Sequence, residues 1–371
     1  MSKMTMAAVA LFLFLAVTAS AQQAETPLPD ALDGVDVVTL VKQGKEVFGK
    51  SAFRSTHEGF AYLFASAENK AEFHSTPEKY AIQLGGVCAR MGGTVRGNPS
   101  DYVLHDGKIY IFGSDECRKR FIATPAKYIP KPVPPVPTSA EAVRRGRALL
   151  DKAAAAHGGA ALDAATSYIE TATTTQQRQM GPVSIVTTSM WRFPGDARSD
   201  RILPMGTQKM TLTTVLTASD AWARGNTRTS TPPPGVVHSI EAMLWRSLIP
   251  LLRVRADQEV AVAALPASGN SKAERVRIIR KGLDVTLIID PGSGRVQSLA
   301  YADRNPEGEV GEITISFEDF RTVDGLLVPF VENAAFNGTP NPALSRRLDS
   351  AAVNTPLDST LFSRPAEGGG Q

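Results

Sequence analysis

The two cysteines and the residues around them are the part of this sequence best suited to chemistry. Cys88 begins the run CARMGG, which also contains Met91, and Cys117 follows later in the run SDECRKRF. Thiolate and thioether sulfur atoms are the ligands that soft metal ions such as Cu(I) prefer. Cys88, Met91 and Cys117 are therefore candidate ligands of a copper ion. His105 lies between them in sequence, but a structural zinc site needs four ligands and no fourth is evident.

The same two cysteines allow two other interpretations. A disulfide between Cys88 and Cys117 would close a loop of about thirty residues and contribute roughly 3–4 kcal/mol in the chain-entropy model. Exported proteins meet an oxidising compartment, where such pairing is common. Two buried, unreactive thiols are the third interpretation. The sequence leaves all three open.

Other residues that commonly carry catalysis do not form a recognisable set. The sequence has no Gly-x-Ser-x-Gly elbow, no His-Glu-x-x-His zinc motif and no phosphate-binding P-loop. Its five histidines yield no convincing Ser/His/Asp set. Lys and Arg number 40 against 37 Asp and Glu, without a basic block, so a nucleic-acid partner is not indicated. We predict a protein that is not an enzyme and needs no cofactor, unless the copper ion considered above is bound.

The first residues predict export. Lys3 precedes the apolar run MAAVALFLFLAVTA, which is too short for a comfortable membrane span. The run ends at Ala19-Ser20-Ala21, the small-x-small pattern of a secretory cleavage site. Residues 1–21 are thus predicted to be a signal peptide that is cleaved near Ala21, leaving a periplasmic chain without a stable membrane span.

A proline-rich segment divides the rest of the sequence. Residues 130–138 read PKPVPPVPT, and such a segment favours an extended polyproline conformation that acts as a semi-rigid spacer. The front part carries an internal repeat, whereas the back part carries many strand-like runs. We therefore expect one domain over residues 31–129 and a second over residues 139–371.

The front domain contains one unit twice. Residues 57–81 and 105–129 match in spacing, each with a turn, an alternating strand (FAYLFA or KIYIFG), a helix and a proline. Ser66 and Ser114 stand where these helices would be capped. We expect the matched Tyr and Phe residues to pack between the strand and the helix of each unit.

These residues resemble the YHS domain family over about residues 31–129. The resemblance rests on DGVDVVTLVKQGKEVFG, YLFASAENKAEF, TPEKYA and GGVCA, and on the CARMGG run. Metal-associated members carry a Cys-x3-Cys near the end of a strand, but here Gly113 replaces the first of these cysteines and only Cys117 is kept. The resemblance implies a small repeat-containing α+β fold. The departure at Gly113 leaves metal binding open.

The back domain is expected to combine helices with a large sheet. An amphipathic helix over residues 140–156 is ended by His157 and two glycines, and His157 is expected to interact with its last carbonyls. Short alternating runs follow, separated by turns, which indicates a largely antiparallel sheet. One apolar helix is expected around residues 235–253. It would pack against the sheet either as plain core or as the wall of a cavity.

The order of these elements resembles the periplasmic lipoprotein-carrier superfamily, of the LolA/LolB-like, outer-membrane lipoprotein-sorting type. The resemblance spans about residues 140–365 and rests on runs such as ALLDKAAAAHGGAALDAATSY, MWRFP, VTLIIDPGSGRVQSLAY and SFEDFRTVDGLLVPF. It implies a curved, incomplete antiparallel β half-barrel with helices, whose apolar interior accepts acyl chains. The residues expected to line that interior are Trp222, Met243, Leu244, Trp245 and Leu248.

These features favour an exported envelope protein of the α+β class that binds its ligand without catalysis. The ligand would be an apolar small molecule, a lipid, an acylated peptide or a lipoprotein, held in the half-barrel. The main alternative is a periplasmic copper-handling protein that uses the front domain. A third interpretation is an envelope interaction module without a small ligand.

Overall fold

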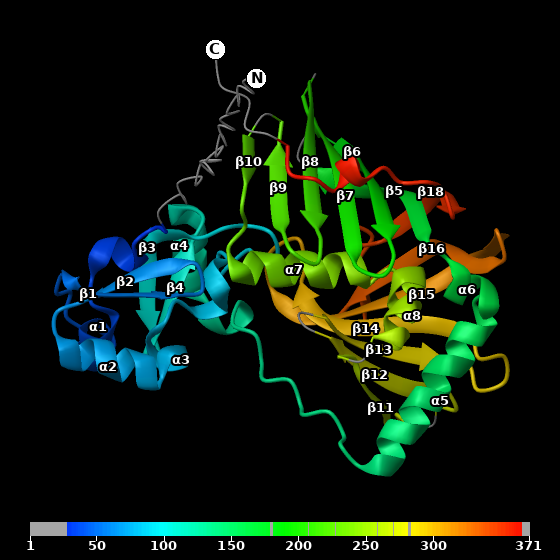
Figure 1. The fold of residues 1–371 in the computed structure, drawn as a ribbon, viewed down its shortest axis with the longest axis horizontal. Helices are drawn as coiled ribbons and strands as arrows, with labels where there is room; N and C mark the ends of the chain where they lie inside the picture. The colour runs from blue at the N-terminus through cyan, green and yellow to red at the C-terminus, as the bar shows by residue number, and fades with distance from the viewer. Residues whose placement is uncertain are drawn as a thin grey trace, which may run out of the picture.

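The computed structural model describes most of the chain between residues 28 and 365. The described ranges are 28–178, 181–206, 208–226, 228–257, 259–269, 271–280 and 283–365. The predicted signal peptide lies outside them. A small N-terminal part of hairpins and short helices lies beside a large antiparallel sheet with its own helices (Figure 1). The expected α+β class is thereby confirmed.

The N-terminal part contains two copies of a hairpin followed by a helix. The first copy comprises β1 (Lys50–His57), β2 (Phe60–Phe64), α2 (Ala67–Ser75) and α3 (Pro77–Tyr80), and α1 (Val37–Gln43) precedes it. The second copy comprises β3 (Asn98–His105), β4 (Lys108–Phe112), α4 (Asp115–Ala123) and the 3₁₀ turn η3 (Pro125–Lys127). The side chains of Ser66 and Ser114 accept backbone N–H groups in the first turns of α2 and α4, so both predicted caps are confirmed.

A small aromatic cluster explains why the matched residues recur. The ring of Phe73 on α2 lies 4.7 Å from that of Tyr62 on β2 and meets the ring of His57 edge-on at 5.7 Å. Edge-on and offset contacts are the arrangements that aromatic rings prefer. The second copy repeats the cluster with His105, Tyr110 and Phe121. The duplicated histidines therefore serve packing in both units.

One open sheet of 14 strands dominates the C-terminal part. In order of pairing its strands are β10 (Arg228–Ser230), β9 (Ala221–Gly225), β8 (Gln208–Leu216), β7 (Asp196–Met205), β6 (Gly181–Arg192), β5 (Ser167–Arg178), β18 (Arg346–Val353), β16 (Leu326–Phe336), β15 (Val310–Val323), β14 (Val296–Arg304), β13 (Leu283–Ile289), β12 (Glu274–Arg280) and β11 (Ala261–Leu265), with β17 (Thr339–Pro340) beside β16. Every one of these pairings is antiparallel. Within the described residues β10 and β11 are the two edges, as expected of an incomplete barrel.

Helices fill the inside of the curved sheet. They are α5 (Ala140–Ala156), α6 (Ala160–Ala164), α7 (Pro234–Trp245) and α8 (Leu248–Arg253). Helix α7 contacts β7 and β8 on one arm of the sheet and β13 on the other, so it lies within the curve (Figure 1). Helix α5 packs on β11, where Gly146 lets the two backbones approach: a Cβ atom there would lie 2.6 Å from the backbone nitrogen of Ala264.

The single helix expected over residues 235–253 is wrong, because the chain forms α7 and α8 with a break at residues 246–247. Pro250 supplies the physical reason. In a continuous helix its ring would clash with the carbonyl group of Arg246, and it has no N–H to donate. The break places Ser247 where its hydroxyl can donate to a buried carboxylate of β5. Among the described residues no helix has both the length and the apolar character that a membrane crossing requires.

The two parts of the chain touch where α7 begins. Gly235 lies against the 3₁₀ turn η2 (Gln83–Gly86), and a Cβ atom on it would lie 2.3 Å from the carbonyl oxygen of Leu84. Nearby, the Arg304 guanidinium donates to the backbone oxygens of Arg90 and Tyr128 at 3.2 and 2.8 Å. In the other direction, the Arg90 guanidinium donates to the carbonyl oxygen of Glu307 at 2.8 Å, and Lys127 pairs with Glu309 at 2.6 Å. The contact thus combines close backbone approach with polar bonds from both parts.

Candidate functional site

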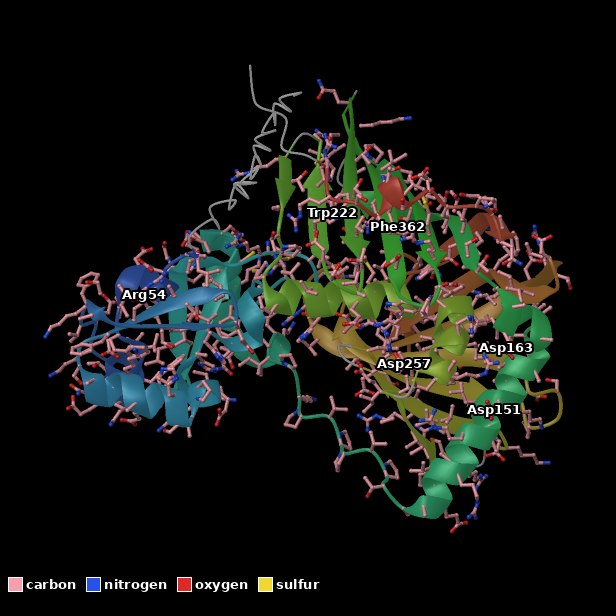
Figure 2. The ribbon with its side chains drawn as sticks, viewed as in Figure 1. Arg54, Asp151, Asp163, Trp222, Asp257 and Phe362 are labelled. Carbon is pink, nitrogen blue, oxygen red and sulfur yellow. The ribbon has the colours of Figure 1, made fainter. Side chains whose placement is uncertain are left out.

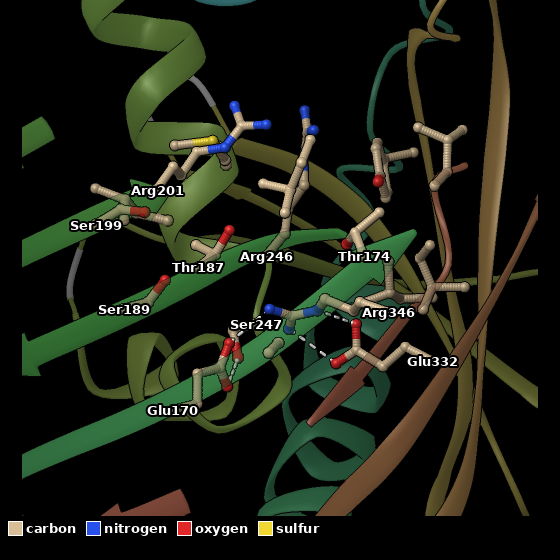
Figure 3. Close-up of a pocket in the computed structure, with 18 of the residues that line it drawn as sticks. Glu170, Thr174, Thr187, Ser189, Ser199, Arg201, Arg246, Ser247, Glu332 and Arg346 are labelled. Atoms are coloured by element: carbon tan, nitrogen blue, oxygen red, sulfur yellow. Dashed lines mark hydrogen bonds and ion pairs between the residues drawn. The ribbon is translucent and has the colours of Figure 1, made fainter. Parts of the chain in front are cut away.

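A cavity of about 300 Å³ lies between the sheet and α7 (Figure 3). Strands β5, β6 and β7 supply one wall, while β14, β15, β16 and the α7–α8 junction supply the other. Two kinds of side chain line it. The polar ones are Glu170, Thr174, Gln176, Thr187, Ser189, Ser199, Arg201, Arg246, Ser247, Glu332 and Arg346. The apolar and aromatic ones are Ala172, Ile185, Trp191, Met243, Leu244, Leu299, Tyr301, Ile315, Phe317, Ala343 and Leu344.

The apolar wall comes from regular alternation along β14 and β15. Leu299 pairs with Ile315 across these strands, and Phe317 follows Ile315 on the same face. Each is less than one-tenth exposed. Met243 and Leu244 on α7 cover this wall from above. Together they make a surface that an apolar chain can enter at little desolvation cost.

A buried ion cluster closes one end of the cavity. Arg346 on β18 donates from Nη1 to Oε1 of Glu170 at 2.7 Å and from Nη2 to Oε1 of Glu332 at 2.8 Å. The second oxygen of Glu170 accepts the Ser247 hydroxyl at 2.8 Å. Burial raises the pKa of the Glu332 carboxyl, and the adjacent Arg346 charge partly opposes this effect. In Figure 3 the Arg346 guanidinium lies between the two carboxylates.

Two further arginines line the opposite side of the cavity. The Arg246 guanidinium pairs with Asp303 at 2.5 Å and lies over the ring of Tyr301, 3.9 Å from its centre. Arg201, on β7, forms no ion pair or hydrogen bond through its side chain to any other described residue. Burial lowers the pKa of the Arg201 guanidinium. The cavity therefore contains one positive charge that the described chain does not compensate.

Of the five residues predicted to line the interior, Met243 and Leu244 do so. Trp222 lies elsewhere: it packs against Val215 and Phe362 on the other face of the sheet, and its indole N–H donates to the carbonyl oxygen of Phe362 at 3.3 Å (Figure 2). The C-terminal segment around Phe362 covers that face of the sheet. An apolar residue of this strand can therefore be buried on either face of the sheet.

Trp245 and Leu248 also lie outside the cavity lining, within the main hydrophobic core. The ring of Trp245 faces the Arg280 guanidinium at 5.1 Å rather than the cavity. Trp245 lies two positions after Met243, which places it about 200° around the helix and directs its side chain away from the side that Met243 faces. Leu248 follows the break at residues 246–247, which changes the direction of the chain.

The polar wall was not foreseen from the sequence. Thr187 and Ser189 on β6, with Ser199 and Arg201 on β7, read as part of ordinary strands. Their alternation indicates one shared face, but nothing local shows that this face is turned inward. Trp191 on β6 also lines the cavity, and its indole N–H finds no acceptor in the described chain.

The three sulfur-containing residues of the N-terminal part do lie together. Cys88 and Cys117 are buried in one small cluster, with Met91 packed against it, and both cysteines are free thiols in the structure. The Arg90 guanidinium lies 2.9 Å from the Met91 sulfur and 3.9 Å from that of Cys117. Burial raises the pKa of the Cys88 thiol. Nowhere in the described ranges do three or more His, Cys, Asp or Glu side chains form a potential metal site. The copper ion and the disulfide both stay predictions.

Thiol labelling separates these possibilities. If Cys88 and Cys117 pair, the protein isolated in air and denatured without reductant should show no reactive thiol. Labelling of both cysteines would contradict the pairing. Uptake of one Cu(I) ion per chain by the reduced protein, lost in Cys117→Ala, would then support the metal site, because a thiolate ligand would be missing.

Comparison with known proteins gives only weak likenesses. No protein-family model matches the sequence, and no curated protein matches it either. Three solved structures share part of the shape: an outer membrane lipoprotein-sorting protein domain from Vibrio parahaemolyticus (TM-score 0.38, 11% identity), a DUF1329 family protein from Desulfovibrio piger (0.37, 10%) and a LolA superfamily protein from Nitrosomonas europaea (0.40, 10%). They cover 59%, 60% and 59% of this chain and 97% of their own. Likeness at this level assigns neither a family nor a ligand.

Proposed function

We propose that this chain is a non-enzymatic binding protein of the bacterial envelope, exported to the periplasm, that holds a lipid, an acylated peptide or another apolar ligand in the cavity beneath α7. The observation that carries the proposal is the cavity itself. Its volume of about 300 Å³ is at the lower end of the range typical of ligand pockets. Export rests on the N-terminal sequence, which has the features of a signal peptide.

The chemistry of the lining supports binding rather than catalysis. The two carboxylates that face the cavity, Glu170 and Glu332, are both engaged by Arg346. Glu170 accepts the Ser247 hydroxyl, but no histidine is among the described residues that line the cavity, so the nucleophile–histidine pair that covalent catalysis commonly uses is not formed by them. The apolar wall of Leu299, Ile315 and Phe317 instead offers surface that gains by taking an apolar group out of water.

A fluorescent fatty-acid analogue tests this proposal on the full chain. Wild-type protein should bind the probe with enhanced fluorescence. Ala172→Phe should weaken binding about tenfold or more, a loss of roughly 1.4 kcal/mol, because Ala172 lines the cavity and the new ring would occupy it. Ala302 on β14 is exposed, so Ala302→Phe is the matched control and should bind as wild type does.

Thermal unfolding of the same variants shows whether they remain folded. If Ala172→Phe keeps its melting temperature and still binds the probe with unchanged affinity, the ligand lies elsewhere. If wild-type protein binds no probe at all, the cavity is a packing defect and the binding function must be abandoned.

A further inference from the structure

Four side chains form a polar patch on the β6–β7 wall of the cavity. In the register of these strands Thr187 pairs with Arg201, and Ser189 pairs with Ser199. Directly paired residues have Cβ atoms about 4.5–5.5 Å apart, and residues two apart on one strand share a face. Thr187, Ser189, Ser199 and Arg201 therefore form a two-by-two block, called the hydroxyl–arginine patch below, and all four line the cavity.

The patch carries donors that lack acceptors. Ser199 is 2% exposed and Ser189 is 7% exposed, yet within the described chain neither hydroxyl makes a hydrogen bond to another protein group. Both serines line the cavity, so each hydroxyl can bond to a ligand held there. Arg201 adds a guanidinium that pairs with no described carboxylate.

The neighbouring acid does not neutralise this arginine. Asp200 follows Ser199 on β7, and alternation turns its side chain to the opposite face of the sheet. There it pairs with Arg198 at 2.9 Å and accepts the hydroxyl of Thr213 at 2.6 Å. The patch thus combines buried hydroxyl donors with one uncompensated positive charge, which matches a partner rich in acceptor oxygens and negatively charged.

The rest of the lining sets the direction of such a ligand. Glu170 pairs with Ser189 in the next position across the sheet, and it belongs to the Arg346 cluster with Glu332. Two carboxylates against one guanidinium make that end formally negative, so an anionic group is repelled from it and drawn toward Arg201. In Figure 3 Arg201 lies on the side of the cavity away from this cluster.

We propose that the hydroxyl–arginine patch binds the anionic group, a carboxylate or a phosphate, of a single-chain amphiphile whose apolar chain lies against Leu299, Ile315 and Phe317. The proposal rests on the binding function given above and names the class of ligand. The modest volume of the cavity favours one chain over several. The guanidinium and the hydroxyls would donate to the anion, while the opposite wall would hold the chain.

Calorimetric titration of the full chain with a matched set of probes tests the proposal. Dodecanoate and dodecyl phosphate carry the two anionic groups, and dodecanol carries the same chain without charge. Arg201→Met should weaken binding of the preferred anionic probe about tenfold or more, because a hydrogen bond to a charged group is lost. The affinity of Arg201→Met for dodecanol should differ from that of wild type by less than about twofold. Arg201→Lys should keep most of the affinity for the anionic probe.

Arg347 supplies the control, since it is exposed on β18 and its removal changes the net charge by the same amount. Arg347→Met should bind all probes as wild type does. The ratio of the affinities for dodecanoate and dodecyl phosphate identifies the anionic group. The anion site would be overturned if Arg201→Met lost affinity equally for dodecanol and both anionic probes while its melting temperature stayed unchanged. The proposal that the cavity binds an apolar ligand would then still stand. Wild-type protein that binds none of the three chains would overturn both proposals.

Discussion

Arg346→Met is expected to lower the free energy of unfolding by about 3–5 kcal/mol, the cost of leaving a buried charge without its partner. Glu170 and Glu332 are only 2% and 6% exposed, and Arg346 donates to both. Without the guanidinium, two carboxylates would face each other across the end of the cavity. Urea unfolding at pH 7, followed by circular dichroism, measures the change.

Two further variants make this result specific. Arg347→Met removes the adjacent exposed arginine of β18 and should change the free energy of unfolding by less than about 0.5 kcal/mol. Adding Glu170→Gln and Glu332→Gln to Arg346→Met should recover much of the lost stability, because the remaining groups are then neutral. If Arg346→Met alone were as stable as wild type, the ion cluster would contribute nothing to the free energy of unfolding.

The sign of the pH dependence follows from the raised pKa of Glu332. A carboxyl whose pKa is higher in the folded state binds more protons there than in the unfolded chain, so stability falls as pH rises above the unfolded value of about 4.3. Removing Arg346 takes away the charge that opposes this shift. We therefore expect the destabilisation by Arg346→Met to be smallest near pH 4 and to grow toward pH 8. A destabilisation that does not vary over this range would exclude proton uptake by Glu332.

Local sequence patterns predicted most of the elements in this fold. The helix over residues 140–156 is found as α5, and the caps at Ser66 and Ser114 are in place. Each of these features depends on residues close in sequence, such as a capping hydroxyl or an apolar repeat. The local sequence is therefore enough to predict it. The prediction from the internal repeat is confirmed for the same reason, since both copies form a hairpin followed by a helix.

The site was harder to predict because it depends on pairings between distant strands. Arg201 reads as one of several arginines on an exposed strand, and only its register beside Thr187 and its position under α7 make it a cavity residue. Trp222 shows the converse error. The alternating pattern of its strand correctly predicts that Trp222 is buried. It does not predict on which face, because the segment around Phe362, from the far end of the chain, covers the face opposite the cavity.

His157→Ala is expected to lower the free energy of unfolding by about 2–4 kcal/mol, because a buried ring and its hydrogen bonds are lost. As predicted, His157 ends α5, and its backbone N–H donates to the carbonyl oxygens of Ala153 and Ala154 at 3.1 and 3.2 Å. The structure adds that the ring is fully buried between strands. Its Nδ1 lies 2.8 Å from the carbonyl oxygen of Leu327 on β16, and its Nε2 accepts the N–H of Val296 on β14 at 3.1 Å. Only a neutral ring with its proton on Nδ1 satisfies both bonds.

Burial lowers the pKa of His157, which gives this prediction a second, independent signature. Below the unfolded value of about 6.5 the unfolded chain binds a proton that the folded chain does not, so stability is full above that pH and is lost as pH falls toward the folded pKa. Wild-type protein should therefore lose stability faster than His157→Ala between pH 6.5 and pH 5. The exposed His238 provides the control, and His238→Ala should keep the wild-type pH dependence. If wild type and His157→Ala lose stability in parallel over this range, the ring is not held neutral, and its role is packing alone.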